Sequence, residues 1–286
     1  MKKTKQKVVI QGFRGSYHEI AALRYFGPDI EVVPSLTFEE MFKMMAADKE
    51  LSGIIAIENT VSGSILPNYT LIKNSGNYVT GECKLKISMN LMACPGQFID
   101  DILEVRSHPL ALMQCHDYFD DFPSIRLIDS VDTALSAKEI SETGLKGAAV
   151  VASKLAAELY GLEIIASGIE SNKRNFTRFL IIDRKGGTEA AKTDARDGIN
   201  KASVAFKLPH RKGSLVELLS VFAKNDCSLT SIQSNPIIGS EWEYLFYADM
   251  VFPDYQKYRR AIDEGSPLCN ELAIIGEYKE GKVFYD

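Results

Sequence analysis

The side chains best placed for chemistry lie in three short polar segments, each next to a predicted strand. In the first, residues 58–64 (ENTVSGS), the carboxamide of Asn59 and several hydroxyl groups follow a buried strand at residues 53–57. Open α/β sheets bind ligands at the carboxyl ends of their strands, so this segment could hold a small molecule. A plain strand-to-helix turn, with Ser62 or Ser64 as the N-cap, is the simpler interpretation of the segment taken alone.

The second segment, residues 107–115 (SHPLALMQC), predicts the start of a helix. Pro109 suits the first helical turn and Ser107 the N-cap, and the helix should run to about Phe119. Gln114 then lies about two turns from Ser107, so one ligand reaches both only along the N-terminal side of the helix. Free backbone N–H groups at that helix start could also hold an anion.

The third segment, residues 175–182 (NFTRFLII), predicts a strand that carries Thr177 and Arg178 in succession. Successive residues of a strand point to opposite faces, so these two side chains face opposite ways unless a bulge intervenes. Thr177 could be an ordinary β-branched strand residue, and Arg178 could mark a strand edge or pair with a surface carboxylate. The segment alone does not decide between these roles and a site.

Other chemistries are not supported by the spacing of the candidate residues. The histidines, at positions 18, 108, 116 and 210, never form the H-E-x-x-H pattern of zinc hydrolases, and the five cysteines include no C-x-x-C pair. The turn at residues 12–15 lacks the glycine spacing of a dinucleotide fingerprint and the Gly-Lys-Ser/Thr of a phosphate loop. Cys115 and His116 are adjacent, which points them apart on a helix. We therefore expect no metal and no nucleotide cofactor.

The composition is that of an ordinary globular protein. The 286 residues include 33 Lys plus Arg and 38 Asp plus Glu, a net charge of -5, and 45% are hydrophobic. A broadly basic nucleic-acid binder is thereby excluded. The apolar stretch near the start is too short for a signal peptide, and no run approaches the ~18 apolar residues of a membrane span. We expect a cytoplasmic protein with reduced cysteines and no membrane partner.

The order of predicted elements indicates a large α/β domain followed by a smaller one. Over the first two-thirds of the chain, short apolar strands alternate with amphipathic helices, as in domains with mostly parallel sheets, and a pattern this long can hold two lobes. The last third predicts the βαββαβ order of a ferredoxin-like unit. The expected boundaries are 1–183 for the first domain, with lobe one at about 1–80 plus 169–183 and lobe two at about 81–168, then 184–200 for a linker and 201–286 for the second domain.

Six segments, in this order, resemble those of the monofunctional prephenate dehydratases, in which a catalytic domain precedes an ACT regulatory domain. The likeness runs over essentially the whole chain. The segments are 12–22 (GFRGSYHEIAA), 57–64 (IENTVSGS), 107–114 (SHPLALMQ), 175–179 (NFTRF), 213–216 (GSLV) and 242–246 (WEYLF).

The resemblance implies a two-lobed catalytic domain similar to the type 2 periplasmic-binding-protein fold, with the substrate in the cleft between the lobes. It also implies a lyase that converts prephenate to phenylpyruvate, carbon dioxide and water on the way to phenylalanine, without a cofactor. L-Phenylalanine is the implied effector of the ACT domain, and the implied assembly is a homodimer or homotetramer.

The resemblance also implies which residues form the sites. The implied catalytic residues are Asn59, Ser107, Gln114 and Thr177, the substrate-binding residues are Ser16, Thr60, His108 and Arg178, and the effector-binding residues are Gly213, Ser214, Leu215, Ser234 and Asn235. The chain departs from the family pattern where Arg14 and Ser16 replace Pro and Thr, where Thr60 replaces Ser, and where Gln233-Ser234-Asn235-Pro236 replaces Glu-Ser-Arg-Pro. The last change removes a potential ion pair and a cationic contact, which bears on the effector response.

Two residues compete for the role of proton donor to the departing hydroxyl group. Thr177 is favoured, although a hydroxyl is a poor acid, and His108 is the rival because the ordinary pKa of an imidazole lies near neutral pH. Arg178 could bind a substrate carboxylate through two hydrogen bonds. The alternative function is a non-catalytic two-lobed sensor of an organic anion or amino acid, since a fold alone does not establish an activity.

Overall fold

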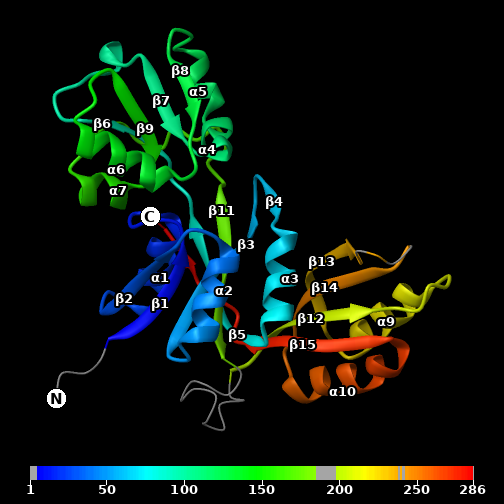
Figure 1. Cartoon of the computed structure of the whole chain (residues 1–286). Coiled ribbons are helices and arrows are strands. Elements are labelled where there is room, and N and C mark those ends of the chain that lie inside the picture. The colour runs from blue at the N-terminus through cyan, green and yellow to red at the C-terminus, as the bar shows by residue number, and fades with distance from the viewer. Residues whose placement is uncertain (1–4, 185–197, 238, 240–241, 286) are drawn as a thin grey trace. The chain divides into compact units, whose positions relative to one another are not determined.

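The computed structural model describes residues 5–184, 198–237, 239 and 242–285, so most of the predicted linker, residues 185–197, lies outside the described residues. The chain forms two compact units (Figure 1). The first contains residues up to 65, 83–179 and the C-terminal residues from 283, and the second contains residues 66–82 and 180–282. Two of the boundaries fall inside strands β5 (Asn77–Lys86) and β11 (Phe176–Arg184), each of which therefore contributes to both units.

The first unit contains two sheets, and its first sheet is built around a central parallel strand. Its other elements are β1 (Gln6–Gln11), α1 (Tyr17–Phe26), β2 (Ile30–Ser35), α2 (Phe38–Ala47), β3 (Leu51–Asn59), β4 (Gly63–Ser64) and β16 (Val283–Phe284). β1 pairs in parallel with β2 and with β3, and beyond β3 the sheet continues with β11 and β5. Val8, Val9 and Ile10 of β1 are fully buried, as expected for a parallel strand covered on both faces.

The second sheet of this unit is mixed and has the strand order β10-β6-β9-β7-β8. Its elements are β6 (Asn90–Ala93), η1 (Ile99–Asp101), β7 (Glu104–Ser107), α4 (Pro109–Gln114), α5 (His116–Asp120), β8 (Arg126–Asp129), α6 (Thr133–Thr143), β9 (Ala148–Ala152), α7 (Lys154–Tyr160) and β10 (Glu163–Ala166). β7 is parallel to β8 and β9, whereas β6 is antiparallel to β9 and β10. The α/β architecture expected from the sequence is confirmed, although this second sheet is mixed rather than mostly parallel. Asn59 and Ser107 end one strand in each sheet.

The second unit contains a four-stranded antiparallel sheet with the order β13-β14-β12-β15. Its elements are α3 (Leu66–Ser75), β12 (Lys201–Lys207), α9 (Ser214–Lys224), β13 (Ser228–Pro236), β14 (Tyr244–Val251), α10 (Tyr255–Gly265), η2 (Ser266–Leu268) and β15 (Glu271–Tyr278). From β12 to β15 the order is strand, helix, strand, strand, helix, strand, as expected from the sequence. Leu218 and Phe222 of α9 and Tyr258 of α10 are buried in one core with Phe206 and Met250 of the sheet.

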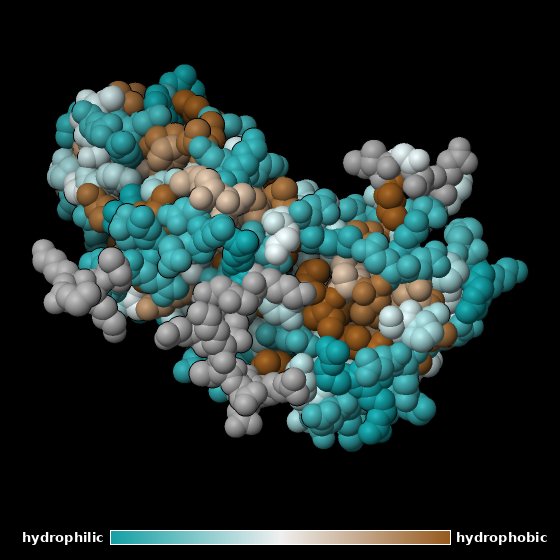
Figure 2. Space-filling model, turned by 60° about the horizontal axis from the view of Figure 1, so that its bottom comes forward, coloured by the Kyte–Doolittle hydropathy of each residue, from teal (hydrophilic) through white to brown (hydrophobic). Residues whose placement is uncertain are grey.

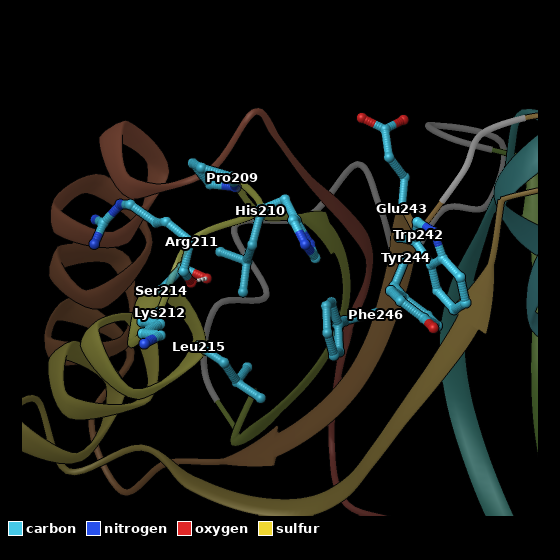
Figure 3. A pocket seen from close by; sticks show the side chains of 11 residues that line it. Pro209, His210, Arg211, Lys212, Ser214, Leu215, Trp242, Glu243, Tyr244 and Phe246 are labelled. Carbon is cyan, nitrogen blue, oxygen red and sulfur yellow. Dashed lines mark hydrogen bonds between the residues drawn. The ribbon is translucent and has the colours of Figure 1, made fainter.

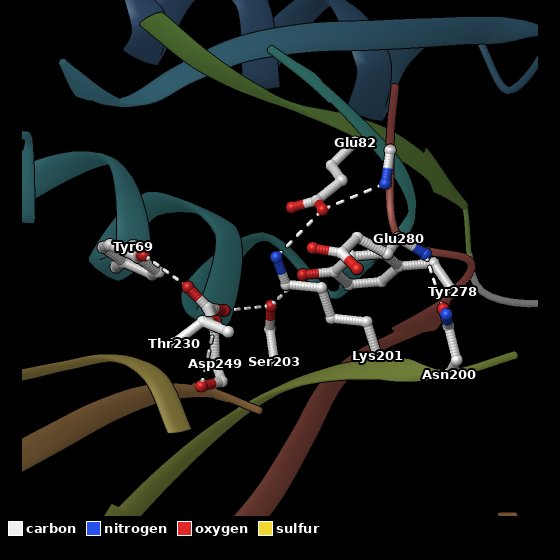
Figure 4. A network of polar contacts seen from close by, with 10 residues as sticks. Tyr69, Glu82, Asn200, Lys201, Ser203, Thr230, Asp249, Tyr278 and Glu280 are labelled. Carbon is white, nitrogen blue, oxygen red and sulfur yellow. Dashed lines mark hydrogen bonds and ion pairs between the residues drawn. The ribbon is translucent and has the colours of Figure 1, made fainter. Parts of the chain in front are cut away.

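A buried polar network ties α3 and the first half of β5 to the sheet of this unit (Figure 4). Lys201 Nζ lies 2.9 Å from Glu82 Oε1, and both side chains are almost completely buried. Asp249 accepts a hydrogen bond from the Tyr69 hydroxyl at 2.9 Å and another from Ser203. Buried charges that are paired and hydrogen-bonded avoid the cost of desolvation without a partner.

This network explains why residues 66–82 belong to the second unit. The sequence predicts nearly all of them in lobe one, with the division between the lobes near Thr80. In the structure their buried groups, Tyr69 and Glu82, find their hydrogen-bond partners in β12 and β14 instead.

Within the described residues, every helix is too short or too polar to cross a membrane.

The ion pair of Lys201 with Glu82 predicts a large effect of charge removal on stability. Lys201→Met leaves the Glu82 carboxylate buried without its cation, so we expect the free energy of unfolding in urea to fall by about 3–5 kcal/mol. The exposed pair of Lys138 with Glu142 provides the control, and Lys138→Met should change stability by less than about 1 kcal/mol. Adding Glu82→Leu to Lys201→Met should restore much of the loss. A single variant as stable as the parent protein would show that Glu82 is not held by this pair.

Candidate active site

Five polar side chains of the first unit form one hydrogen-bonded group, which we call the carboxamide network. Its members are Asn59 at the end of β3, Ser62 in the following turn, Gln114 at the end of α4, Asn175 just before β11, and Thr177 in β11. The network therefore joins residues at β3 and β11 of the first sheet to α4, the helix that follows β7 of the second sheet. Three members are predicted site residues that the structure brings together. Asn175 and Ser62 were missed, although both lie in segments that the sequence singles out.

The orientation of the Asn59 carboxamide is fixed by backbone donors. Asn59 Oδ1 accepts hydrogen bonds from the backbone N–H groups of Val61 at 2.9 Å and Ser62 at 2.8 Å. Backbone N–H groups only donate, so the oxygen must face them and the NH₂ group must face the other way. Asn59 Nδ2 accordingly donates to Asn175 Oδ1 at 2.7 Å and to Thr177 Oγ1 at 2.9 Å.

The orientation of Asn59 also determines which side chain donates each of the other hydrogen bonds in the network. Because Asn175 Oδ1 accepts from Asn59, its Nδ2 is left to donate, and it does so to Gln114 Oε1 at 2.8 Å. Gln114 Nε2 then donates to Ser62 Oγ at 2.8 Å. The bond from the Ser62 backbone N–H to Asn59 closes the ring. Asn175 is fully buried and Gln114 nearly so, which shields these bonds from competition with water.

The network makes Thr177 a hydrogen-bond donor toward any ligand. A hydroxyl group has one proton and two acceptor lone pairs. Thr177 Oγ1 already accepts from Asn59 Nδ2, so its proton cannot lie on that bond and is directed elsewhere. Thr177 is only 9% exposed, which places this donor in a largely dry environment where a hydrogen bond is electrostatically stronger.

Thr60, a predicted substrate-binding residue, forms hydrogen bonds that connect the end of β3 to the start of β11. Its hydroxyl donates to the carbonyl oxygen of Arg174 at 2.8 Å and accepts from the backbone N–H of Phe176 at 2.9 Å. Its own backbone N–H donates to the carbonyl oxygen of Phe176 at 2.9 Å. These bonds hold the end of β3 against the start of β11, which brings Asn59 and Thr177 together.

The predicted N-cap of α4 is wrong by one residue. Ser107 still belongs to β7, is fully buried, and donates its hydroxyl proton to the carbonyl oxygen of Val151 at 2.6 Å. The N-cap is His108, whose Nδ1 accepts from the backbone N–H of Leu110 at 3.2 Å. The reason is Pro109, which occupies the first helical position and holds the residue before it in an extended conformation. Ser107 retains only acceptor capacity for a ligand.

The helix predicted to run to about Phe119 is broken at Cys115, which separates α4 from α5. Gln114 therefore stands at the end of a short helix rather than in its middle. Cys115 is buried, and burial, with a smaller contribution from the charge of Glu170, raises the pKa of its thiol to about 12. A raised thiol pKa keeps the thiolate, the nucleophilic form, scarce at neutral pH. No metal-binding group of three or more His, Cys, Asp or Glu side chains exists among the residues that the structure describes.

The remaining predicted substrate-binding residues lie outside the carboxamide network. Ser16 is the buried N-cap of α1 and accepts from the backbone N–H of Glu19 at 3.4 Å. Arg178 is only 7% exposed, and its strand β11 lies between β5 and β3 in the sheet. The interpretation of Arg178 as the mark of a strand edge is therefore wrong.

The predicted effector residues fall into two groups in the second unit. A cavity of about 540 Å³ beside the start of α9 is lined by Ser214 and Leu215, with Leu215 and Phe246 facing the same hollow (Figure 3). Gly213 precedes α9 with φ of 87°, a backbone conformation that favours glycine. The lining of this cavity does not include Ser234 or Asn235. The two predicted groups are thus not brought together at this cavity within one chain.

Comparisons with known proteins agree with the segments found in the sequence. The family model for prephenate dehydratase matches residues 8–187. A chloroplastic arogenate dehydratase/prephenate dehydratase 2 of Arabidopsis thaliana is 35% identical over 289 residues, which cover 95% of this chain and 72% of that protein.

Two solved structures cover nearly all of the chain. A prephenate dehydratase from Arthrobacter aurescens in complex with L-Phe has a TM-score of 0.85 at 24% identity, covering 96% of this chain and 90% of that one. A protein described as a novel type of quorum quenching acylase, GqqA, has a TM-score of 0.86 at 26% identity, covering 96% and 98%. Since the family model matches more than half of its residues, this chain belongs to the prephenate dehydratase family.

Proposed function

We propose that this chain is a lyase that converts prephenate to phenylpyruvate, carbon dioxide and water. The observation that carries the proposal is the carboxamide network, which presents the buried hydroxyl of Thr177 as a hydrogen-bond donor. Membership of the family and the 35% identity to an arogenate/prephenate dehydratase support the assignment. No cofactor is needed for the reaction.

The reaction suits a site of neutral donors. The bond between the ring and its carboxylate breaks, and its electron pair moves into the ring as carbon dioxide leaves. The carbon–oxygen bond at the opposite ring carbon breaks, so that hydroxide departs with its bonding electrons and takes up one proton, supplied in the net reaction by solvent, to become water. The ring becomes aromatic, so the protein need only orient the substrate and assist the departing oxygen. A donor to that oxygen contributes roughly 10²- to 10⁴-fold.

Thr177 suits this role better than His108 does. The Nδ1 atom of His108 accepts the N–H of Leu110 at the start of α4, so protonating that nitrogen would break the helix cap. The hydroxyl of Thr177 can donate a hydrogen bond to the departing oxygen without breaking its bond from Asn59, which uses a lone pair. Asn59, Ser107, Gln114 and Thr177 remain the proposed catalytic group, and Ser16, Thr60, His108 and Arg178 remain the proposed substrate-binding residues.

The proposed architecture is two-lobed, with each sheet of the first unit forming one lobe in the manner of a type 2 periplasmic-binding-protein fold. This proposal is supported by the carboxamide network, in which side chains of β3, β11 and α4 are joined by hydrogen bonds. The βαββαβ unit is the proposed ACT domain, and 1–183 and 201–286 are the proposed catalytic and regulatory domains with a linker at 184–200. A homodimer or homotetramer is proposed as well. Apolar side chains gather into patches on the face shown in Figure 2, as on proteins that associate.

Replacement of Thr177 tests the proposed reaction. Thr177→Val keeps the shape but removes the donor, so we expect kcat for prephenate to fall at least ~100-fold with little change in KM. Thr177→Ser, the matched control, should keep most of the activity. Phenylpyruvate formation is followed by absorbance in alkali, and arogenate is assayed in parallel by the phenylalanine that it yields.

Several outcomes would contradict the proposal. Near-normal turnover of Thr177→Val, together with an inactive His108→Ala, would move the donor to His108. A parent protein that binds an organic anion or amino acid without converting prephenate or arogenate would be the alternative two-lobed sensor.

L-Phenylalanine is the proposed effector, and the cavity beside α9 is where one part of it would bind. Backbone N–H groups at the start of this 11-residue helix suit a carboxylate, and Leu215, Trp242 and Phe246 suit an aromatic ring. Ser234 and Asn235 would complete the site from a second copy of the chain. The complex of the Arthrobacter aurescens protein with L-Phe supports the choice of ligand.

Helix α3 is the proposed route from the effector site to the catalytic network. Asn235 Nδ2 donates to Thr70 Oγ1 at 3.2 Å. Thr70 Oγ1 also forms a hydrogen bond of 3.1 Å with the Tyr247 hydroxyl oxygen. The ring of the neighbouring Tyr69 stacks on the ring of Tyr247, and the two ring centroids are 5.2 Å apart. α3 begins soon after Ser62 in the chain, so a shift of Asn235 on effector binding would reach the turn that orients Asn59.

Loss of the Thr70 hydroxyl should weaken this coupling. In Thr70→Val we expect the phenylalanine concentration for half-inhibition to rise at least ~5-fold, because a typical coupling energy of about 1–3 kcal/mol is reduced. Turnover without phenylalanine should change little. Ser228→Ala, which alters an exposed serine at the start of β13, is the control. Unchanged inhibition in Thr70→Val would exclude α3 as the route.

A further inference from the structure

We infer that Ser62 is a second hydroxyl donor of the active site, and that it binds the side-chain carboxylate of the substrate. This inference rests on the proposed function. Ser62 lies in the turn between β3 and β4, three residues after Asn59, and its side chain is exposed. It closes the carboxamide network but has no counterpart among the predicted site residues.

The direction of the network decides what the Ser62 hydroxyl can do. Ser62 Oγ accepts from Gln114 Nε2 at 2.8 Å, and Gln114 is held in that orientation by Asn175. A lone pair of Ser62 is thus occupied by an amide donor, and its single proton is directed away from Gln114. Thr177, at the other branch of the network, likewise accepts from an amide and keeps its proton free of that bond. The amide donors therefore end at two hydroxyl groups, each of which has a proton available for a ligand.

The chemistry of the substrate assigns a different partner to each hydroxyl. The bonds in the network polarise one another, and a polarised hydroxyl matches an anionic oxygen best. A donor to the ring carboxylate would stabilise the charge that must be lost as carbon dioxide, and so would oppose the reaction. The side-chain carboxylate keeps its charge throughout. It is the group that Ser62 can bind equally well in the ground state and the transition state.

Uniform binding predicts a distinctive kinetic effect. Ser62→Ala should raise KM for prephenate about tenfold and leave kcat nearly unchanged, because one hydrogen bond to a charged group is lost in both states. Phenylpyruvate retains the side-chain carboxylate but lacks the ring carboxylate. Its dissociation constant, measured by calorimetry, should rise by the same factor. Ser62→Thr keeps a hydroxyl and should restore binding.

Ser64→Ala is the matched control, since Ser64 lies two residues away in β4 and takes no part in the network. A fall in kcat with unchanged KM in Ser62→Ala would show that Ser62 acts only by positioning Gln114, and would overturn the inference. Unchanged KM and unchanged phenylpyruvate affinity would overturn it too. Because the calorimetric measurement needs no turnover, loss of phenylpyruvate binding in Ser62→Ala supports the role of Ser62 even if the parent protein proves inactive.

Discussion

Two backbone hydrogen bonds to one side-chain oxygen determine the polarity of the whole candidate site. The N–H groups of Val61 and Ser62 hold Asn59 Oδ1, and every other amide of the network must then donate in one direction. If the Asn59 carboxamide were reversed, its oxygen would face Thr177 and would compete for the hydroxyl proton that the reaction uses. A tight turn after β3 thus controls chemistry on a different strand.

The fold contributes by fixing three otherwise separate chain segments. Thr60 joins the end of β3 to the start of β11, and the break at Cys115 leaves Gln114 at the end of a short helix. The turn at Val61 and Ser62 leads on to α3, whose Tyr69 is held by the buried Asp249 of the second unit. The segment that orients Asn59 therefore continues into a helix anchored by residues more than a hundred positions away in sequence.

The sequence predicts the parts of this account that depend on local pattern. Asn59, Gln114 and Thr177 stand in segments with a recognisable order, and the βαββαβ order follows from apolar periodicity. Asn175 and Ser62 were missed because their roles depend on hydrogen bonds between side chains that are far apart in sequence. The spacing of residues along the chain does not reveal such bonds. The grouping of residues 66–82 was equally hidden, since the partners of Tyr69 and Glu82 lie far along the chain. The N-cap of α4 could have been predicted correctly from the sequence, because a proline at the first helical position makes the residue before it, His108, the N-cap.

The most direct test of the account is the position of hydrogen atoms in the carboxamide network, measured by neutron diffraction from a deuterium-exchanged crystal. We expect both deuterons of the Asn59 amide on Nδ2, directed at Asn175 Oδ1 and Thr177 Oγ1, and the hydroxyl deuteron of Thr177 off the line to Asn59. A Thr177 deuteron that lies on the bond to Asn59, with the carboxamide reversed, would contradict it.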